Sequence, residues 1–486
     1  MKRWVVMVLS GLLLTGLMAV SGWGEDPLPA YKPADYGSAY ACYPTCILPN
    51  YIVAEDFNQD GWLDLAVSCF ATSDVWTYRN LGNPVSASAP GAFSYFGGPA
   101  AAGDIPGLPG QFAVGLGPIA LATGHVSAYN GFPDVAVLSQ IAPGMSRVDP
   151  NANGTAPIGL PGPALVRPVH FAVGDFDHTD RILDFAVIDV PPLPAVPTIN
   201  LYYNGALAGP PVPAVPPPGI PCFIVVADFD DDGWDDIAVV TTGTNRLLIS
   251  YGPGFAAWVP AYGLGFIPTA MDVGDFNADG FLDIVVVGNT IDGSGLAEVF
   301  LNNVRAHTFA GQGVMQTWGF NTTFVEVLDA DGNGRDDFVT ANHDSHTLTV
   351  FLAYINGTEK DDRAKRPECC LCDAQSKKDK IKFKGFKIEL ECGYFPTCLV
   401  RGDFDRNGRM DLAVTLYSAT KEVCPQNPSC IELIFDVACD AQEGQELHRI
   451  DPKLEPQGCD LCKEEPCKEN VPPKAEIQTE SGTKNP

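Results

Sequence analysis

The sequence has few positive charges, and this shortage excludes several kinds of partner. Its 486 residues hold 30 Lys and Arg against 59 Asp and Glu, which gives a formal net charge of −29. Nucleic acids and anionic membrane surfaces are bound through clusters of basic side chains, because their phosphates must be neutralised. We therefore expect neither as a partner.

Long apolar runs and recognisable catalytic motifs are also missing. Beyond residues 4–20, no stretch approaches the roughly 20 apolar residues that a membrane-spanning helix needs, so we expect no membrane insertion. A nucleophile elbow, a phosphate-binding glycine loop and a two-histidine zinc helix are absent. The seven histidines fall in different repeats or tails, apart from His343 and His346, for which a turn after a strand is the simpler account.

The N-terminus has the pattern of a secretory signal peptide. Met1, Lys2 and Arg3 are followed by the apolar residues 4–20 and then by small residues that suit cleavage. We expect a signal peptide over residues 1–24 and export of the remaining chain. Export exposes the 15 cysteines to oxidising conditions, which favour disulfides.

Three cysteine pairs are close in the sequence and predict local disulfides: Cys42/Cys46, Cys392/Cys398 and Cys424/Cys430. The odd number of cysteines predicts one free or intermolecular thiol. The segments Cys369-x-x-Cys372 and Cys459-x-x-Cys462 would also suit a four-thiolate zinc site. Disulfides are the favoured interpretation, because the compartment is oxidising.

A turn rich in Asp and Asn recurs seven times and organises the chain. Five copies carry Asp or Asn at positions 1, 3 and 5, Gly at position 6 and Asp at position 9. Their oxygen-bearing residues are Asp56, Asn58, Asp60 and Asp64; Asp228, Asp230, Asp232 and Asp236; Asp275, Asn277, Asp279 and Asp283; Asp329, Asp331, Asn333 and Asp337; and Asp403, Asp405, Asn407 and Asp411.

Two further copies are degraded. The turn at 175–184 has one extra residue and no glycine, and the turn at 125–134 has lost its first acid. We expect no tight metal binding at either.

The five intact turns predict calcium sites. Hard oxygen ligands in a tightly curled loop suit Ca²⁺, and glycine allows the sharp turn. An EF-hand would need Glu at position 12 and flanking helices, but Val67, Val239 and Val286 are aliphatic and lie in β-type segments. Metal-free hairpin turns are the weaker alternative, because clustered carboxylates repel one another.

Short apolar runs flank each turn and read as buried strands, as in 51–54 and 65–67. A third run follows most of these pairs, for example at 247–251 and 348–352. Seven such units predict an all-β, seven-bladed β-propeller over residues 47–440. We expect an N-terminal segment at 25–46, a cysteine-rich insertion at 358–391, and a cysteine-rich, partly disordered tail at 441–486.

The Asp-Phe-Asn/Asp-x-Asp-Gly-x-x-Asp signature resembles the FG-GAP/VCBS repeat over about residues 47–440. This repeat forms the blades of the seven-bladed propeller in integrin α-subunits and in many secreted bacterial proteins. The resemblance implies calcium-binding turns and a role in adhesion or recognition. It does not imply a particular activity.

Non-catalytic recognition of an extracellular protein or polysaccharide is therefore the function we predict. One alternative is a carbohydrate-active enzyme, in which acids from separate blades meet over the central channel. Another is a structural extracellular component. The sequence leaves the oligomeric state open.

Overall fold

The computed structural model describes residues 41–80, 93–95, 110–126, 131–151, 154–158, 165–178, 182–203, 206–207, 219–258, 261–355, 381–390, 394–418, 429–434 and 437. The chain divides into two units, residues 1–448 and residues 449–486, and every described residue belongs to the first. The expected signal peptide, the tail at 441–486 and the four cysteines of the alternative zinc site lie outside the described residues.

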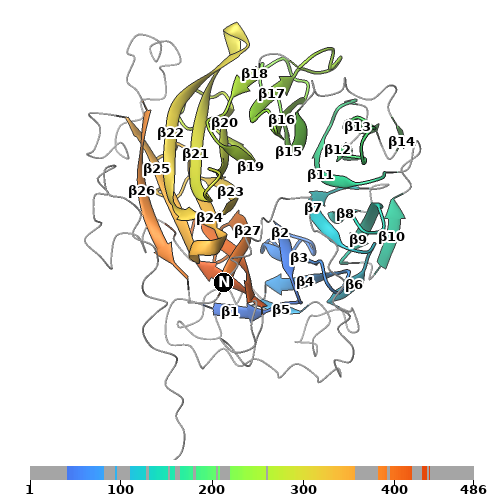
Figure 1. Ribbon diagram of the computed structural model, residues 1–486. Coiled ribbons are helices and arrows are strands. Elements are labelled where there is room, and N and C mark those ends of the chain that lie inside the picture. Colours follow the sequence, from blue (N-terminus) through green and yellow to red (C-terminus); the bar gives the residue numbers. More distant parts are fainter. Residues whose placement is uncertain are drawn as a thin grey trace, which may run out of the picture. The chain divides into compact units, whose positions relative to one another are not determined.

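Seven antiparallel sheets make up the first unit, and each is one blade of a β-propeller (Figure 1). Blade 1 contains β2 (Pro49–Glu55), β3 (Asp64–Cys69), β4 (Asp74–Asn80), β5 (Phe93–Tyr95) and β6 (Gln111–Ala113), and blade 2 contains β7 (Pro118–Gly124), β8 (Asp134–Ser139), β9 (Gly144–Asp149) and β10 (Gly154–Ile158). Blade 3 contains β11 (Pro168–Gly174), β12 (Asp184–Asp189), β13 (Thr198–Tyr203) and β14 (Ala206–Leu207). Blade 4 contains β15 (Ile220–Ala227), β16 (Asp236–Thr242), β17 (Arg246–Ser250) and β18 (Ala261–Gly263).

Blades 5 to 7 follow the same order. Blade 5 contains β19 (Ile267–Gly274), β20 (Asp283–Asn289), β21 (Ser294–Asn303) and β22 (Thr308–Phe320). Blade 6 contains β23 (Thr322–Leu328), β24 (Asp337–Asn342), β25 (Thr347–Ile355) and β26 (Ile381–Glu389). Blade 7 contains β27 (Tyr394–Gly402), β28 (Asp411–Ser418), β29 (Ser429–Ile434) and β1 (Ala41–Pro44). Two short 3₁₀ helices, η2 (Val304–Ala306) and η3 (His343–Ser345), complete the described elements.

The apolar runs of the sequence explain why these strands form. The second strand of each blade is buried along most of its length, as the sequence Asp-Leu-Ala-Val-Ser-Cys of β3 shows. The phenylalanine at turn position 2 adds to the core between blades: Phe276 of blade 5 packs edge-on against Phe338 of blade 6. The prediction of an all-β, seven-bladed propeller is confirmed.

The innermost strands contact one another around a closed ring, in the order β2, β7, β11, β15, β19, β23 and β27, and β27 contacts β2 again. Their starting ends lie together. Asn50 Nδ2 donates to Pro118 O at 3.0 Å, and Thr397 Oγ1 donates to Pro49 O at 2.9 Å. All seven strands therefore run the same way, and the turns that follow them lie on one face of the ring.

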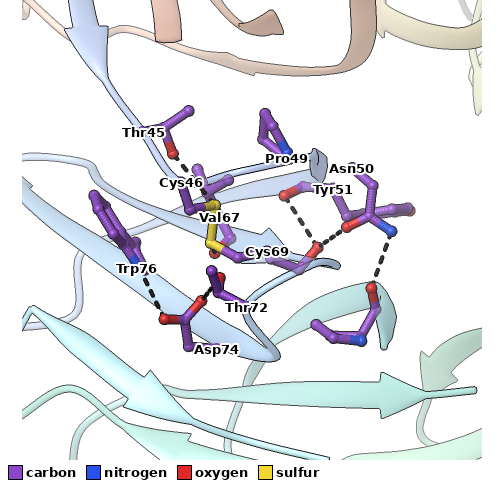
Figure 2. The surroundings of a disulfide bond; sticks show 12 residues. Thr45, Cys46, Pro49, Asn50, Tyr51, Val67, Cys69, Thr72, Asp74 and Trp76 are labelled. Atoms are coloured by element: carbon purple, nitrogen blue, oxygen red, sulfur yellow. Dashed lines mark hydrogen bonds between the residues drawn. A yellow bond between two sulfur atoms is a disulfide. The ribbon is translucent and has the colours of Figure 1, made fainter. Parts of the chain in front are cut away.

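The N-terminal strand closes this ring. β1 pairs antiparallel with β29, so residues 41–44 complete the last blade although they precede the first. A disulfide between Cys46 and Cys69 then fastens the chain after β1 to the end of β3 (Figure 2). The closing contact between blades 7 and 1 is thus both hydrogen-bonded and covalent.

The predicted cysteine pairs are wrong in two of three cases. Cys46 pairs with Cys69 and not with Cys42, because β1 carries Cys42 away into blade 7. Cys398 is a free, buried thiol, as is Cys222. Cys430 is disulfide-bonded, and its predicted partner Cys424 lies outside the described residues.

Two boundaries also differ from those expected. Residues 381–389 were expected in an insertion, but they form β26 and pair with β25 along its length. The alternation of Lys with Ile and Phe in β26 is the period-2 pattern of an edge strand. Residues 41–44 belong to blade 7, not to a separate N-terminal segment. No helix among the described residues is long and apolar enough to cross a bilayer.

Candidate metal-binding loop face

Every Asp-rich turn joins the innermost strand of a blade to its second strand, so the seven turns share one face of the ring, here called the loop face. Neighbouring turns touch one another. Leu183 N donates to His125 O at 2.8 Å between blades 3 and 2, and Asp175 N donates to Asp235 Oδ2 at 2.8 Å between blades 3 and 4. The loop face is therefore one connected surface.

Two left-handed residues give the intact turns their shape. Position 6 is always glycine, with φ between 80° and 89°. Position 4 also has positive φ, although it is glycine only in blade 6; the residues are Gln59, Asp231, Ala278, Gly332 and Arg406. The sequence pattern revealed the first of these positions but not the second.

The aspartate at position 1 holds the turn together. In blade 5, Asp275 Oδ1 accepts the N–H of Asp279 at 3.0 Å, and Oδ2 accepts the N–H of Gly280 at 2.8 Å. The same pair of bonds recurs at Asp56, Asp228, Asp329 and Asp403. This side chain is therefore fixed, with its carboxylate directed into the turn.

The side chain at position 5 also forms a hydrogen bond within the turn. Its side-chain oxygen accepts the N–H of position 7, as Asp279 does from Phe281 at 3.0 Å. The equivalent bonds are made by Asp60, Asp232, Asn333 and Asn407.

The acids that do converge are those at positions 1, 3 and 9. In four turns these three residues offer carboxylate oxygens that all lie within 4.8 Å of one another; the groups are Asp175, Asp177 and Asp184; Asp228, Asp230 and Asp236; Asp329, Asp331 and Asp337; and Asp403, Asp405 and Asp411. We call these groups the acid triads. Blades 1 and 5 have Asn58 and Asn277 at position 3, so an amide oxygen stands in for the third carboxylate.

The aspartate at position 9 is a buried anchor. In blade 4, Asp236 is fully buried, and it accepts the N–H of Phe229 at 2.8 Å and of Gly252 at 2.7 Å. Asp283 and Asp337 bond in the same way to two backbone N–H groups. This carboxylate thus ties the turn to the third strand of its blade.

Burial makes these anchors hard to ionise without a nearby cation. Burial, together with a smaller effect of neighbouring acids in the same turns, raises the pKa of Asp64 to about 8 and that of Asp283 to about 8. Burial likewise raises the pKa of Asp236 to about 7. A cation bound among these carboxylates would favour their charged forms.

The residues present fit a calcium ion. Their ligand atoms are all oxygens, and the turns expose them in a flexible geometry. Two carboxylate oxygens of the intact turns, Asp64 Oδ2 and Asp230 Oδ1, are buried without a hydrogen-bond partner, as is Asp134 Oδ1 of blade 2. Buried polar atoms are normally satisfied, so each of the two oxygens in the intact turns has a lone pair free for a metal.

The turn of blade 3 is closer to the intact turns than its sequence indicated. His178 occupies position 4 with φ of 52°, and its N–H donates to Asp175 Oδ1 at 2.7 Å. Asp184 accepts the N–H of Phe176 at 2.9 Å, as a position 9 anchor does. The extra residue therefore leaves the acid triad of Asp175, Asp177 and Asp184 assembled.

Blade 2 lacks the acids at positions 1 and 3 and has an arginine instead. Its anchor, Asp134, is 2% exposed, and Arg147 Nη1 from β9 lies 3.7 Å from Asp134 Oδ2. Burial raises the pKa of Asp134 to about 6, while the charge of Arg147 lowers it. The one turn without the first acid thus contains a protein cation beside its anchor.

Two acids lie on neighbouring innermost strands. Asp272 on β19 accepts the N–H of Val327 at 2.8 Å, and Glu326 on β23 accepts the N–H of Arg401 at 3.3 Å. Burial, and then the charge of Asp272, raise the pKa of Glu326 to about 8. The sequence reasoning singled out neither residue, because each lies inside an apolar run.

A β-propeller with acidic turns on one face is the class of protein that these features define. A family model described as an FG-GAP-like repeat matches residues 228–286, from the turn of blade 4 into β20 of blade 5. The chain is thus a seven-bladed β-propeller that contains an FG-GAP-like repeat. No curated protein gives a significant match.

Solved structures of low sequence identity are also similar to the chain. BBS1N, in complex with ARL6DN, has a TM-score of 0.48 at 10% identity, over 82% of this chain and 96% of that one. A putative 6-phosphogluconolactonase from Bacteroides fragilis has a TM-score of 0.45 at 10% identity, over 72% and 86% of the two chains. Similarity at this level assigns no function.

Proposed function

We propose that the protein is an exported, calcium-binding, non-catalytic recognition module whose loop face binds a surface protein or polysaccharide. The observation that carries the calcium part is the set of acid triads. Three carboxylates within 4.8 Å of one another repel unless a cation lies among them. Oxygen ligands alone favour calcium over zinc, which prefers Cys and His.

The residues that hold the ion are those at positions 1, 3 and 9, with position 5 supporting the loop. Calcium supplies positive charge there, which ionises the anchor and offsets part of the net charge of −29. Because the anchor also bonds to the third strand, ion binding stabilises the hairpin and the blade together. The proposed number of such sites is five, and the geometry of blade 3 supports a sixth.

The recognition part rests on the loop face as a rigid platform. Binding residues are commonly carried on loops that a stable scaffold positions. Half-exposed aromatic rings lie at position 7 of three turns: Trp62, Trp234 and Phe281. The Arg406 guanidinium lies 4.3 Å from the Trp62 ring, and His178 stacks on Trp234. Such rings suit stacking against sugars or apolar protein groups.

Two measurements test the proposal separately. Chelation should lower the melting temperature by at least about 10 °C, because several ions that bind only the folded state are lost. An array of glycans and matrix proteins, probed with calcium and with chelator, should give calcium-dependent binding. An unchanged melting curve would refute the calcium part. A lack of binding to every ligand on the array, both with calcium and with chelator, would refute the recognition part.

A carbohydrate-active enzyme is the second candidate, and Asp272 with Glu326 favours it. Glycosidases pair a protonated acid with an ionised one, and the raised pKa of Glu326 suits the former, although burial raises the pKa of Asp272 as well. Both acids also join neighbouring blades through backbone N–H groups, which gives them a structural role. Hydrolysis of a polysaccharide that Glu326→Gln abolishes, in a variant with unchanged melting temperature, would establish the enzyme.

A further inference from the structure

The face opposite the loop face carries most of the exposed large apolar side chains. It is built from the starts of the innermost strands and the turns between second and third strands, which antiparallel pairing places together, as Pro118 with Ser139 and Gly144. Eight of the ten exposed large hydrophobic residues in the described part of the chain lie there, and only Val314 and Met410 do not.

Six of these side chains form what we call the aliphatic patch, on blades 1 to 3. They are at least 50% exposed, and Leu193 reaches 91%. The members are Ile47, Leu116, Ile141, Val166, Leu193 and Val196.

Hydrogen bonds hold the pieces of the aliphatic patch side by side. Within blade 2, Ile141 N donates to Leu116 O at 3.0 Å. Gln140 Nε2 donates to Pro168 O at 3.1 Å and so joins this turn to the strand that follows Val166. The segments that carry Leu116, Ile141 and Val166 therefore have fixed relative positions on blades 2 and 3.

The same surface lacks exposed charge. Among the described turn and strand-start residues of blades 1 to 3, the charged side chains are Asp74, Arg167 and Asp189, and none is exposed. Asp189 accepts the N–H groups of Val166 and Arg167 at 3.0 and 2.7 Å, and Asp74 accepts from Trp76 Nε1 at 3.2 Å. The acid triads, by contrast, all lie on the other face.

We propose that the aliphatic patch is the interface of a face-to-face dimer, in which the patch of one copy meets the patch of a second. A two-fold interface uses the same surface on both copies, so that surface must be compatible with itself. An uncharged aliphatic surface meets this condition. Homodimer interfaces are also more apolar than other contacts, and interface centres are poor in charge.

The distribution of charge favours this pairing over other contacts between copies. Each chain has a formal net charge of −29, so two copies repel one another in most orientations. Packing the patch against a loop face would remove carboxylates from water, which is costly. Patch against patch keeps the acid triads of the two copies as far apart as the fold allows.

This dimer would present two loop faces in opposite directions. The purpose assigned to it rests on the proposed function. One dimer could then bridge two surfaces that carry the ligand. Two linked sites also bind a repetitive ligand more tightly than one, when both can be engaged together.

Solution mass tests the dimer. Protein purified after expression of the full-length chain should sediment as a dimer, in calcium, over a range of concentrations. Leu116→Asp with Leu193→Asp places charge in the patch at two exposed positions and should give a monomer. Val314→Asp, at a 48% exposed position on β22, is the matched control and should remain a dimer. Unchanged circular dichroism confirms that the variants fold.

Three outcomes would overturn the proposal. Wild-type protein could remain a monomer up to its highest soluble concentration. The double variant could remain a dimer, which would place the interface elsewhere. A monomer that floats with phosphatidylcholine vesicles, and loses this with the double variant, would make lipid the occupant of the patch. Since mass is read without any ligand, failure of array binding would leave this result unaffected.

Discussion

The turns of blades 2 and 4 each contain a buried aspartate at the anchor position, but the charges around the two aspartates differ. In blade 4, Asp236 lies beside Asp228 and Asp230, and all three are acids. In blade 2, Asp134 lies beside Arg147, and the acids at positions 1 and 3 are absent. Burial raises the pKa of the anchor to about 7 in blade 4 and to about 6 in blade 2.

This difference separates two roles that the intact turns combine. The anchor at position 9 connects the turn to the rest of the blade, and it persists where the other acids are lost. The acids at positions 1 and 3 add the oxygens of the proposed calcium site. In blade 2, where they are missing, Arg147 supplies positive charge beside the anchor.

The largest effect should come from removing an anchor. Asp283→Ala leaves the N–H groups of Phe276 and Asn302 buried without their acceptor, each at a cost of roughly 1–3 kcal/mol. We expect the free energy of unfolding to fall by about 3 kcal/mol, measured by urea denaturation in calcium. Asp292→Ala, on an exposed turn, is the control. A loss of less than about 1 kcal/mol would show that the anchor is dispensable.

The arginine of blade 2 should show a smaller effect that depends on pH. Arg147→Met leaves Asp134 without its cation and should cost about 2 kcal/mol at pH 8, less than a fully buried pair because Arg147 is partly exposed. The folded pKa of Asp134, about 6, lies above the ordinary value of 3.8. The protonated side chain of Asp134 therefore contributes fully to stability below pH 3.8, and this contribution is lost as the pH rises through 6.

Removing the arginine raises this pKa further, so the loss should continue to higher pH. Denaturation of Arg147→Met and wild type from pH 4 to 8 should therefore show a difference that grows with pH. Arg246→Met, at an exposed position of blade 4, controls for loss of one positive charge. A difference independent of pH would mean that Arg147 acts through packing alone.

The third comparison sets blade 3 beside blade 4. Asp175→Ala and Asp228→Ala each remove position 1 of an acid triad. Each should reduce the calcium-dependent rise in melting temperature by roughly 2–4 °C, as expected when about 1 kcal/mol of binding is lost. If Asp228→Ala reduces the rise and Asp175→Ala does not, the extra residue in blade 3 prevents binding, as its sequence suggested.

Local patterns explain most of the fold that the sequence predicts. The turn with its glycine, the apolar second strand and the third run are each formed by neighbouring residues, so they repeat visibly. Ring closure is different. Residues 41–44 pair with β29, nearly 400 residues later, and nothing in four residues specifies so distant a partner. The Cys46–Cys69 disulfide follows from the pairing of β2 with β3, which sets Pro49 opposite Cys69, so sequence spacing alone misassigned it.

The sequence likewise predicts one part of the candidate site and not another. Positions 1, 3 and 9 could be predicted, because oxygen ligands at fixed spacing have a chemical reason. The convergence of Asp175, Asp177 and Asp184 could not, since it depends on how the turn accommodates its extra residue. Arg147 was also missed, because it comes from β9 and reaches Asp134 only after the blade has formed.

The smallest predicted effect concerns position 4, where blades 5 and 6 differ. Ala278 has φ of 56°, and Gly332 occupies the same place with φ of 69°. A left-handed conformation costs a residue with a Cβ roughly 1–2 kcal/mol, whereas glycine loses roughly 0.5–1 kcal/mol of chain entropy. Ala278→Gly should therefore stabilise the protein by about 0.5 kcal/mol, and Gly332→Ala should destabilise it by a similar amount. A Cβ at Gly332 would meet no atom within 4 Å, so the second variant introduces no clash.

Urea denaturation at saturating calcium measures both changes. A much larger loss for Gly332→Ala would show that glycine at this position serves the metal ligands and not only the backbone, and the calcium-dependent rise in melting temperature should then fall with it.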